Sequence, residues 1–407
     1  MLGLVAALLL AQPAADWPQW LGPKRDNVSP ETVRPWADPP ATAWTVKCGP
    51  GFSTPAVAGG RVFVHARVKG QDAEEVIALD AASGKELWRT AYPRAPYSSA
   101  LNTGPQATPA VAGGRVYTFG ITGVLSCFAA DTGATVWQVD CGKHPDLRMR
   151  VPRFGVTCSP LVVGSRVVVA VGGQGRAVVG FDADTGAVAW KGLDESAGTA
   201  SPVLRANKPG QLPDVVVMTT LRLVGLNPLD GAVAWEFPLA FQPGGTAPTP
   251  LVAGDTVLTT TTSNGTTAVR LKPDGEGEQA WQAAGVRGYF SSGVVAGPDG
   301  VFLVANQLDP VPRADLACLD LKTGKVYWKQ DGLGYFHFGL VRTGDGKLLM
   351  LDDLGTLRLA EASPAGYKEL CKAKVCDGTM VSPALAGGRL YVRDDRGVSC
   401  VVLNGGK

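Results

Sequence analysis

Histidine and cysteine are the residues of this chain best suited to catalysis or metal binding, and their spacing matches neither role. The three histidines, His65, His144 and His337, are widely separated, and no group of residues has the spacing of metal ligands. His337 stands in the aromatic stretch GLGYFHFG, residues 332–339, a setting more typical of a packed ring than of a catalyst. We therefore predict no metal site and no catalytic histidine.

The cysteines point to structural positions. No two are adjacent, and the haem-attachment pattern C-x-x-C-H does not occur. Cys127, Cys318 and Cys400 occupy one equivalent repeat position, and Cys48 and Cys376 share another. This recurrence favours small buried side chains. In an oxidising compartment Cys371–Cys376 and Cys48–Cys400 are candidate disulfides, although sequence alone does not determine the pairing. The eight cysteines are Cys48, Cys127, Cys141, Cys158, Cys318, Cys371, Cys376 and Cys400.

Two long stretches, residues 89–106 and 139–157, carry arginine and aromatic residues that suit a binding surface. Long loops on a rigid scaffold often hold binding residues, and Arg and Tyr are favoured at interfaces. The alternative is that both stretches are solvated loops covering one face of the fold. The candidate binding residues here are Arg94, Tyr97, Asn102, Gln106, Arg153 and Phe154.

A tryptophan repeat organises the chain that must position these residues. Seven tryptophans recur at intervals of 44 to 53 residues, and five of them follow a glycine by four positions. A second phrase, of the form STPAVAGGRVFV, has eight starts spaced by roughly 47 residues, close to the period of propeller blades. The repeat tryptophans are Trp44, Trp88, Trp137, Trp190, Trp235, Trp281 and Trp328, and the glycines are Gly84, Gly133, Gly186, Gly231 and Gly324.

The two phrases predict an all-β, eight-bladed β-propeller with four antiparallel strands in each blade. An apolar run, a Gly-Gly turn and an alternating run describe one hairpin, and D-A-A-S-G-K closes a second. Residues 382–403 supply three strands, so the strand containing Trp44 is expected to complete that blade and close the ring. An open solenoid is the alternative arrangement.

The phrase [AG]-x-D-x-x-[ST]-G-x-x-x-W resembles the tryptophan-docking repeat of the pyrroloquinoline quinone (PQQ) dehydrogenase-like propellers. The opening DWPQWLGPKRDNVS and the closing VCDGTMVSPALAGGRLYVRDDRG are similar to secreted PQQ-like repeat proteins. The superfamily contains quinoprotein alcohol dehydrogenases and non-catalytic members such as BamB of the outer-membrane assembly machinery. The resemblance therefore implies the fold, whereas activity depends on the site.

In the dehydrogenases of that superfamily, PQQ lies in the central funnel with Ca²⁺, a catalytic Asp, an Arg and an adjacent Cys-Cys disulfide. In this chain the positions expected at the funnel mouth contain no carboxylate. We therefore predict a non-catalytic binding or scaffold module without a cofactor. The alternative is a PQQ- and Ca²⁺-dependent dehydrogenase, and a propeller that degrades sugars or polymers would need paired carboxylates. The funnel positions are Phe52, Gln106, Thr157, Thr199, Ala247, Phe290, Phe336 and Met380, with His337 beside them.

The N-terminal residues predict an exported protein. Residues 1–15 resemble a signal peptide, followed by a Trp/Pro-rich segment at 16–41 and the propeller at 42–407; a buried first strand is the alternative for the apolar run. The first cysteine is Cys48, so no lipid anchor is expected. Lys and Arg number 38 against 36 Asp and Glu, which gives no excess to attract nucleic acid. We expect a monomer without a transmembrane segment, in the periplasm or outside the cell, that binds a protein or another envelope component.

Overall fold

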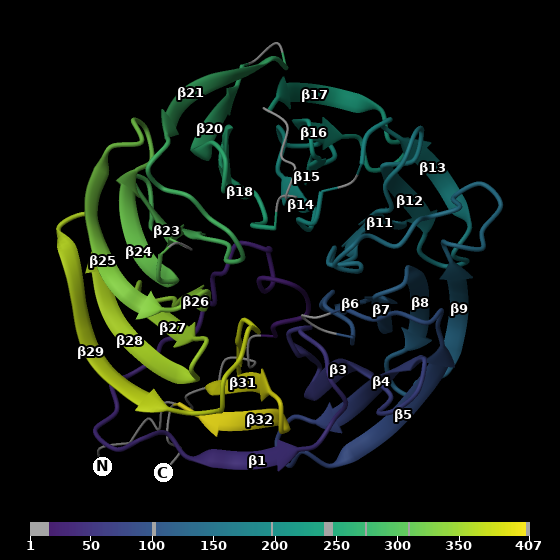
Figure 1. The fold of residues 1–407 in the computed structure, drawn as a ribbon, viewed down its shortest axis with the longest axis horizontal. Helices are drawn as coiled ribbons and strands as arrows, with labels where there is room; N and C mark the ends of the chain where they lie inside the picture. Colours follow the sequence, from purple (N-terminus) through teal and green to yellow (C-terminus); the bar gives the residue numbers. More distant parts are fainter. Residues whose placement is uncertain are drawn as a thin grey trace, which may run out of the picture.

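The computed structural model describes residues 16–99, 103–196, 198–239, 247–272, 275–307 and 310–403. Within these ranges every regular element is a β-strand. The strands form eight four-stranded antiparallel sheets around a central axis (Figure 1). The prediction of an eight-bladed β-propeller is confirmed.

The blades are numbered here in chain order, with strands given from the axis outward. Blades 1 to 3 consist of β2 (Ala56–Ala58), β3 (Arg61–Arg67), β4 (Ala73–Asp80) and β5 (Glu86–Pro93); β6 (Ala110–Ala112), β7 (Arg115–Phe119), β8 (Val124–Ala129) and β9 (Thr135–Asp140); and β10 (Leu161–Val163), β11 (Arg166–Ala170), β12 (Val178–Asp182) and β13 (Val188–Gly192). Blades 4 to 6 consist of β14 (Val203–Arg205), β15 (Asp214–Met218), β16 (Arg222–Leu226) and β17 (Val233–Pro238); β18 (Leu251–Ala253), β19 (Thr256–Thr261), β20 (Gly265–Leu271) and β21 (Gly277–Ala283); and β22 (Val294–Val295), β23 (Gly300–Gln307), β24 (Arg313–Asp320) and β25 (Val326–Gly334). Blade 7 consists of β26 (Phe338–Arg342), β27 (Leu348–Asp352), β28 (Thr356–Ser363) and β29 (Gly366–Lys374), and blade 8 of β30 (Ala384–Ala386), β31 (Arg389–Asp394), β32 (Gly397–Val402) and β1 (Thr42–Val46).

Blade 8 closes the ring by combining the two ends of the chain. Strand β1 pairs antiparallel with β32, placing Trp44 opposite Cys400 and Val46 opposite Val398. In Figure 1 the purple β1 lies outside the yellow β32. The predicted closure by the N-terminal strand is confirmed. In this blade β30 pairs with β31, β31 with β32, and β32 with β1, so the strands from the two parts of the chain form one sheet.

The antiparallel order gives the ring two distinct faces. The first strand of each blade follows the connection from the preceding blade. In most blades it ends in a tight turn, such as the one at Gly59 and Gly60, which both have positive φ. The connections between blades therefore gather on one face, called the loop face below. The turns after the first and third strands gather on the other, called the turn face.

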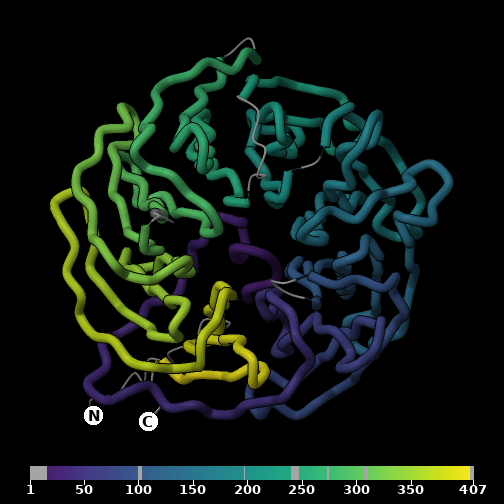
Figure 2. The backbone as a smooth tube through the Cα atoms, in the orientation of Figure 1, coloured from purple at the N-terminus to yellow at the C-terminus, as the bar shows by residue number. Residues whose placement is uncertain are grey.

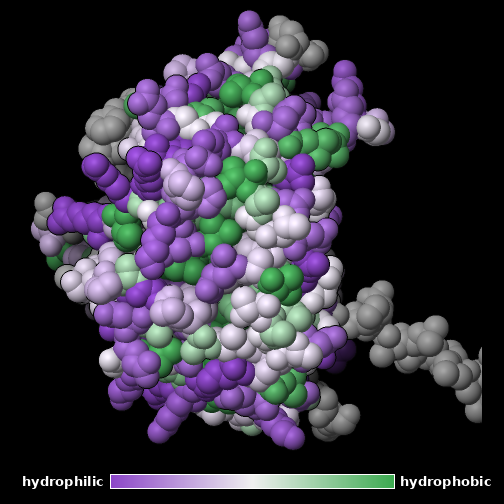
Figure 3. All heavy atoms as spheres, turned by 90° about the vertical axis from the view of Figure 1, so that its right-hand side faces the viewer, coloured by the Kyte–Doolittle hydropathy of each residue, from purple (hydrophilic) through white to green (hydrophobic). Residues whose placement is uncertain are grey.

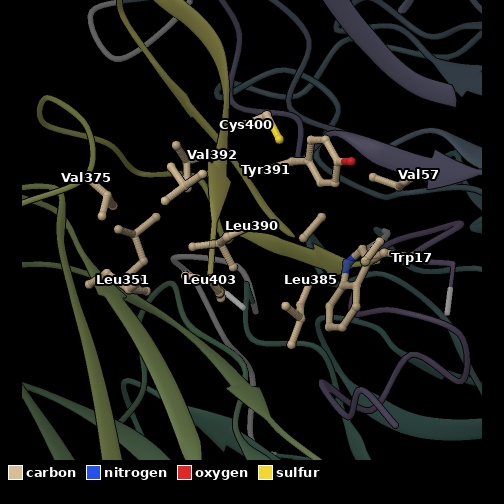
Figure 4. Close-up of a cluster of buried hydrophobic side chains, with 14 of the residues drawn as sticks. Trp17, Val57, Leu351, Val375, Leu385, Leu390, Tyr391, Val392, Cys400 and Leu403 are labelled. Atoms are coloured by element: carbon tan, nitrogen blue, oxygen red, sulfur yellow. The ribbon is translucent and has the colours of Figure 1, made fainter. Parts of the chain in front are cut away.

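The hydrophobic core lies between neighbouring blades. Apolar side chains of the first three strands form clusters that each combine residues from adjacent blades. The largest cluster joins blades 7, 8 and 1 across the ring closure, and it includes Trp17, Val57 and Leu385 (Figure 4). Over the rim that carries β9 and β13, apolar residues appear as small separate groups among hydrophilic ones (Figure 3). Stability therefore comes from contact between blades, which single blades lack.

Candidate functional site

Most of the repeat tryptophans pack against the following blade. The indole of Trp44 covers Gly84, and the indole of Trp137 covers Gly186, in each case so closely that a Cβ on the glycine would overlap the ring. The Trp137 Nε1 also donates a 3.0 Å hydrogen bond to the Ala183 carbonyl of the same turn. The glycine of each repeat phrase thus receives the tryptophan of the preceding blade. The remaining glycine–tryptophan pairs are Gly133 with Trp88, Gly231 with Trp190, and Gly324 with Trp281.

Trp235 and Trp328 depart from this pattern. The Trp235 Nε1 donates a 2.9 Å hydrogen bond to the Asp214 carboxylate within its own blade. In the next blade the glycine at the equivalent position, Gly277, lies against Phe237 instead of under an indole. Trp328 donates to the Ser363 carbonyl, and no glycine among the described residues lies beneath its ring. These differences arise because the turns after the third strands of blades 5 and 7 lack the left-handed glycine that the other docking turns place four residues before a tryptophan.

Three of the cysteines lie opposite docking tryptophans. Strand pairing places Cys127 against Trp137, Cys318 against Trp328 and Cys400 against Trp44. The same slot is filled by alanine or glycine in the other blades with a repeat tryptophan, and a Cβ on Gly180 would overlap Trp190. The slot therefore requires a small side chain, which explains why cysteine recurs there.

The candidate disulfides are not formed, and all eight cysteines are free thiols. Cys400 lies opposite Trp44, whereas Cys48 lies four residues further along and beyond the end of β1. Cys371 is in the extended strand β29, and Cys376 follows that strand by two residues. At about 3.3 Å per residue, an extended chain holds both pairs too far apart for a disulfide.

A belt of Ser and Thr residues surrounds the axis where the first strands begin. The Thr54 amide donates to the Thr108 hydroxyl of the next blade at 3.1 Å, and the Thr108 amide donates to Ser159 at 3.0 Å. Ser159 and Thr249 continue the pattern toward Ser201 and Ser292 at 2.9 Å. The Ser/Thr-Pro pairs of the second phrase therefore link blades around the channel.

The predicted funnel positions lie just before this belt, on the loop face. Several contact their neighbours in adjacent blades: the Phe52 amide donates to the Pro105 carbonyl, and the Thr157 hydroxyl donates to the Thr199 carbonyl. Phe336 is 41% exposed, and Phe290 is half-buried and meets Tyr289 edge-to-face at 4.2 Å. Ala247 and Met380 are also half-buried. This inner part of the loop face is thus mainly aromatic and neutral.

Sequence reasoning missed the residues that fill the axial channel. Residues 16–33, called the axial segment below, pass through the centre of the ring (Figure 2). Trp17 pairs with Val57 of β2, and the Asp16 carboxylate accepts hydrogen bonds from the Gly59 amide. At the far end of the segment, Glu31 accepts hydrogen bonds from the glycine amides of the β30–β31 turn. The segment therefore enters and leaves at the turn face.

The middle of the axial segment reaches the Ser/Thr belt. Arg25 is 3% exposed, and its guanidinium donates to the carbonyl oxygens of Pro202, at 2.7 Å, and Pro160. Burial lowers the pKa of Arg25 to about 10, so it stays protonated at neutral pH. Asn27 donates to the Gly293 carbonyl at 3.0 Å, and Trp20 donates to the Thr249 hydroxyl at 2.9 Å. Side chains of the axial segment thus fill the channel at the height where the first strand of each blade begins.

The two long loops lock together on the loop face of blades 1 to 3. The Tyr97 hydroxyl donates to the Arg153 carbonyl at 3.0 Å, and the Gln106 amide donates to the Phe154 carbonyl at 2.5 Å. Val151 and Phe154 are 37% and 38% exposed, and the Arg153 guanidinium lies 5.5 Å from the centre of the Phe154 ring. Asn102 lies outside the described residues. The structure thus brings Tyr97, Gln106, Arg153 and Phe154 into one surface.

Arg94 is placed differently, with its side chain fully buried at the base of the first loop. It donates to the Ala95 and Thr103 carbonyls at 2.7 and 3.1 Å, and its Nε lies 3.8 Å from the Glu74 carboxylate. Glu74 also accepts from Tyr92 at 2.9 Å. Burial alone would raise the pKa of Glu74, but hydrogen bonds from His65 and other neighbours hold it below its usual value. This buried network suits anchoring of the loop.

His337 is buried between blades 6 and 7. Its Nδ1 lies 2.7 Å from the Ser291 hydroxyl, and its Nε2 has no hydrogen-bond partner among the described residues. Burial lowers the pKa of His337 to about 4, against a small opposing effect of Asp353. Asp353 accepts hydrogen bonds from the backbone amides of Tyr335 and Phe336. The structure thus places His337 between two blades as a buried, neutral imidazole.

The described residues do not fit a Ca²⁺–quinone site. No group of three or more His, Cys, Asp or Glu side chains in the described ranges is arranged to hold a metal ion. The funnel positions contain no carboxylate, and Arg25, Asn27 and Trp20 fill the channel at the belt. Calcium requires six to eight hard oxygen ligands, which this surface does not supply.

The family model for the outer membrane protein assembly factor BamB matches residues 37–97 and 72–330. The chain belongs to the BamB family. It is 24% identical to the outer membrane protein assembly factor BamB of Yersinia pestis over 304 residues, covering 71% of this chain and 72% of that protein. The crystal structure of BamB from Moraxella catarrhalis superposes with a TM-score of 0.62 and 16% identity, covering 89% of this chain and 99% of that chain.

A shorter relationship links the chain to a quinoprotein. It is 36% identical to the quinohemoprotein alcohol dehydrogenase ADH IIB of Pseudomonas putida over 128 residues, which covers 28% of this chain. The match spans only 17% of the length of that enzyme. The predicted relationship to PQQ-like propellers of the BamB type is confirmed.

Proposed function

We propose that this BamB-family propeller is a non-catalytic scaffold of the cell envelope that binds a protein partner through its loop face. Relatives in the family are named as outer membrane protein assembly factors, which supports a role in the assembly of envelope proteins. In this proposal the protein is exported to the periplasm, where it can reach envelope proteins during their assembly. No helix in the described ranges is long and apolar enough to cross a membrane.

The observation that carries the proposal is the interlocked surface of the two long loops. Hydrogen bonds from Tyr97 and Gln106 fix the backbone of the second loop at Arg153 and Phe154. The surface exposes Val151, Phe154 and the Arg153 side chain on this fixed backbone. Pre-organised aromatic and arginine side chains bind protein partners with little loss of conformational freedom.

Site-specific photo-crosslinking in the native host tests this function. A photo-reactive residue at Phe154 is expected to crosslink to a protein of the outer-membrane assembly machinery. The same residue at Leu229, which is 47% exposed in a turn on the opposite face, serves as the matched control and is expected to give no such product. Equal crosslinking at both positions, or none at either, contradicts a partner on the loop face.

The quinoprotein function is the second candidate because of the 36% identical stretch shared with ADH IIB. Incubation of the purified protein with PQQ and Ca²⁺ is expected to give neither a stoichiometric quinone absorbance nor dye-linked alcohol oxidation. Stoichiometric quinone together with alcohol oxidation would replace the scaffold proposal by an oxidoreductase.

A further inference from the structure

We propose that the axial channel is a peptide-binding site and that its ligand is the protein's own axial segment, residues 16–33. The segment would be held by recognition of its side chains and not merely by its covalent connection to β1. This site is distinct from the loop-face surface, because the segment enters and leaves at the turn face.

The axial segment makes hydrogen bonds to every blade. Those to blades 1 to 4 come from Trp17, Pro18 and Arg25, and those to blades 5 and 6 from Trp20 and Asn27. Ser29 donates to Arg342 of blade 7, and Glu31 accepts from the glycine amides of blade 8. A connecting peptide needs few such bonds, whereas a bound ligand is recognised through many.

Arg25 gives the site its chemical specificity. The carbonyl oxygens of Ser159, Pro160 and Pro202 converge on its guanidinium, and Gln19 of the segment itself accepts from Nε at 2.9 Å. No carboxylate lies within ion-pair distance of Arg25 among the described residues, so the site is made of backbone oxygens at fixed positions. The planar, forked guanidinium matches such a set of acceptors, and the ammonium of lysine does not.

The backbone of the axial segment shows that the channel imposes its conformation. Leu21, Arg25 and Asn27 have φ values of 59°, 57° and 60°, in the left-handed region that leucine and arginine avoid and asparagine tolerates. Such conformations persist only where the surroundings determine them. Arg25 and Asn27 are the residues whose side chains bind blades 3, 4 and 6. Backbone strain and side-chain recognition therefore coincide at Arg25.

Two carboxylates fix the ends of the ligand. Asp16 accepts from the Gly59 amide of the first turn of blade 1, and Glu31 accepts from the Gly388 amide of the first turn of blade 8. These blades meet at the ring closure, so the segment bridges the junction that joins the chain ends. The ligand class that follows is a peptide beginning Asp-Trp-Pro, with a buried arginine and an asparagine two residues after it.

The test uses the full chain with a protease recognition sequence inserted between Asp38 and Pro39, both exposed. After cleavage of the folded protein, the N-terminal fragment is expected to co-elute with the propeller on size exclusion. A fluorescent synthetic peptide of residues 16–38 is then expected to exchange into the site. Elution of the fragment apart from a folded propeller, or unfolding of the propeller on cleavage, overturns the proposal.

Competitor peptides identify the side chain that is recognised without altering the protein. A 16–38 peptide carrying Lys24→Ala is expected to compete as well as the natural sequence, because Lys24 is exposed. A peptide carrying Arg25→Lys is expected to compete at least about 10-fold less well, since its ammonium cannot bridge the same carbonyl oxygens. Equal competition by the two peptides overturns recognition through Arg25.

Discussion

Gly84 lies directly beneath the indole of Trp44, and a Cβ atom added to Gly84 would come within 2.6 Å of the ring. Trp44 belongs to β1 in blade 8, whereas Gly84 belongs to the turn after β4 in blade 1. The contact therefore crosses the junction that closes the ring. The Trp44 Nε1 also donates a 3.2 Å hydrogen bond to the Ala81 carbonyl of the same turn.

Replacing Gly84 by alanine is expected to destabilise the propeller by about 3 kcal/mol. A left-handed alanine costs about 1 kcal/mol or more, and overlap with the indole adds a further 1 to 3 kcal/mol. Urea unfolding followed by tryptophan fluorescence measures the change.

Gly114→Ala is the matched control, because Gly114 has the same φ of 72° but no atom within 4 Å of an added Cβ. It is expected to cost only about 1 kcal/mol. Equal losses in the two variants would show that tryptophan packing adds nothing to the conformational cost.

The state of the cysteines gives a second prediction. Six of the eight thiols are buried, and burial raises the pKa of Cys158 to about 11 and that of Cys376 to about 12. Thiolates are the reactive form, so a thiol reagent at pH 8 is expected to modify at most Cys48 and Cys371 in the folded protein. In denaturant without reductant, all eight thiols are expected to react. A count of six or four would reveal disulfides that the structure does not contain.

The sequence predicts the ring well because most blades repeat the same short pattern of strand and turn residues. Asp80 illustrates this: its carboxylate accepts from the Ser83 amide at 2.8 Å, and Gly84 takes the left-handed conformation that completes the turn. Such interactions are local and recur in several blades, so the pattern alone indicates the fold. The eighth blade is also predicted by the sequence, because the three strands expected near its C-terminal end and the single strand containing Trp44 add up to one four-stranded blade.

The axial segment could not be predicted in the same way. Its partners are far away in sequence, as the hydrogen bond from Arg25 to Pro202 shows, and it contains no repeat or periodic pattern. The left-handed φ of Arg25 also runs against local preference, since tertiary contacts override it. Of the candidate binding residues, Tyr97 and Phe154 come together through their loops, whereas Arg94 is buried at the loop base, which the spacing of residues in the sequence does not indicate. That the loops bind a partner stays a prediction.

Arg94→Gln is expected to loosen the first loop and to destabilise the protein by about 3 kcal/mol. The substitution removes the cation beside the buried Glu74 and breaks the hydrogen bond to the Thr103 carbonyl, and loss of one partner of a buried pair is costly. Limited proteolysis is expected to cut faster within residues 94–106. Arg150→Gln, at an exposed position of the second loop, is the control and should leave both measurements unchanged. Equal proteolysis of the two variants would mean that Arg94 does not anchor the loop.

His337 is expected to make the protein sensitive to acid. Burial holds the pKa of His337 near 4 in the folded state, below its ordinary value of 6.5, so the unfolded chain binds a proton more readily between these values. Stability therefore rises with pH across this window and is lost as the pH falls toward 4. A difference of about 2.5 pKa units corresponds to about 3 kcal/mol.

Urea unfolding of the wild type and of His337→Gln at pH 7.5, 6.5, 5.5 and 4.5 isolates the contribution of this side chain. The difference in stability between the two proteins is expected to shift in favour of the variant as the pH falls. A difference that stays constant from pH 7.5 to 4.5 would show that His337 is protonated in the folded protein as easily as in the unfolded chain.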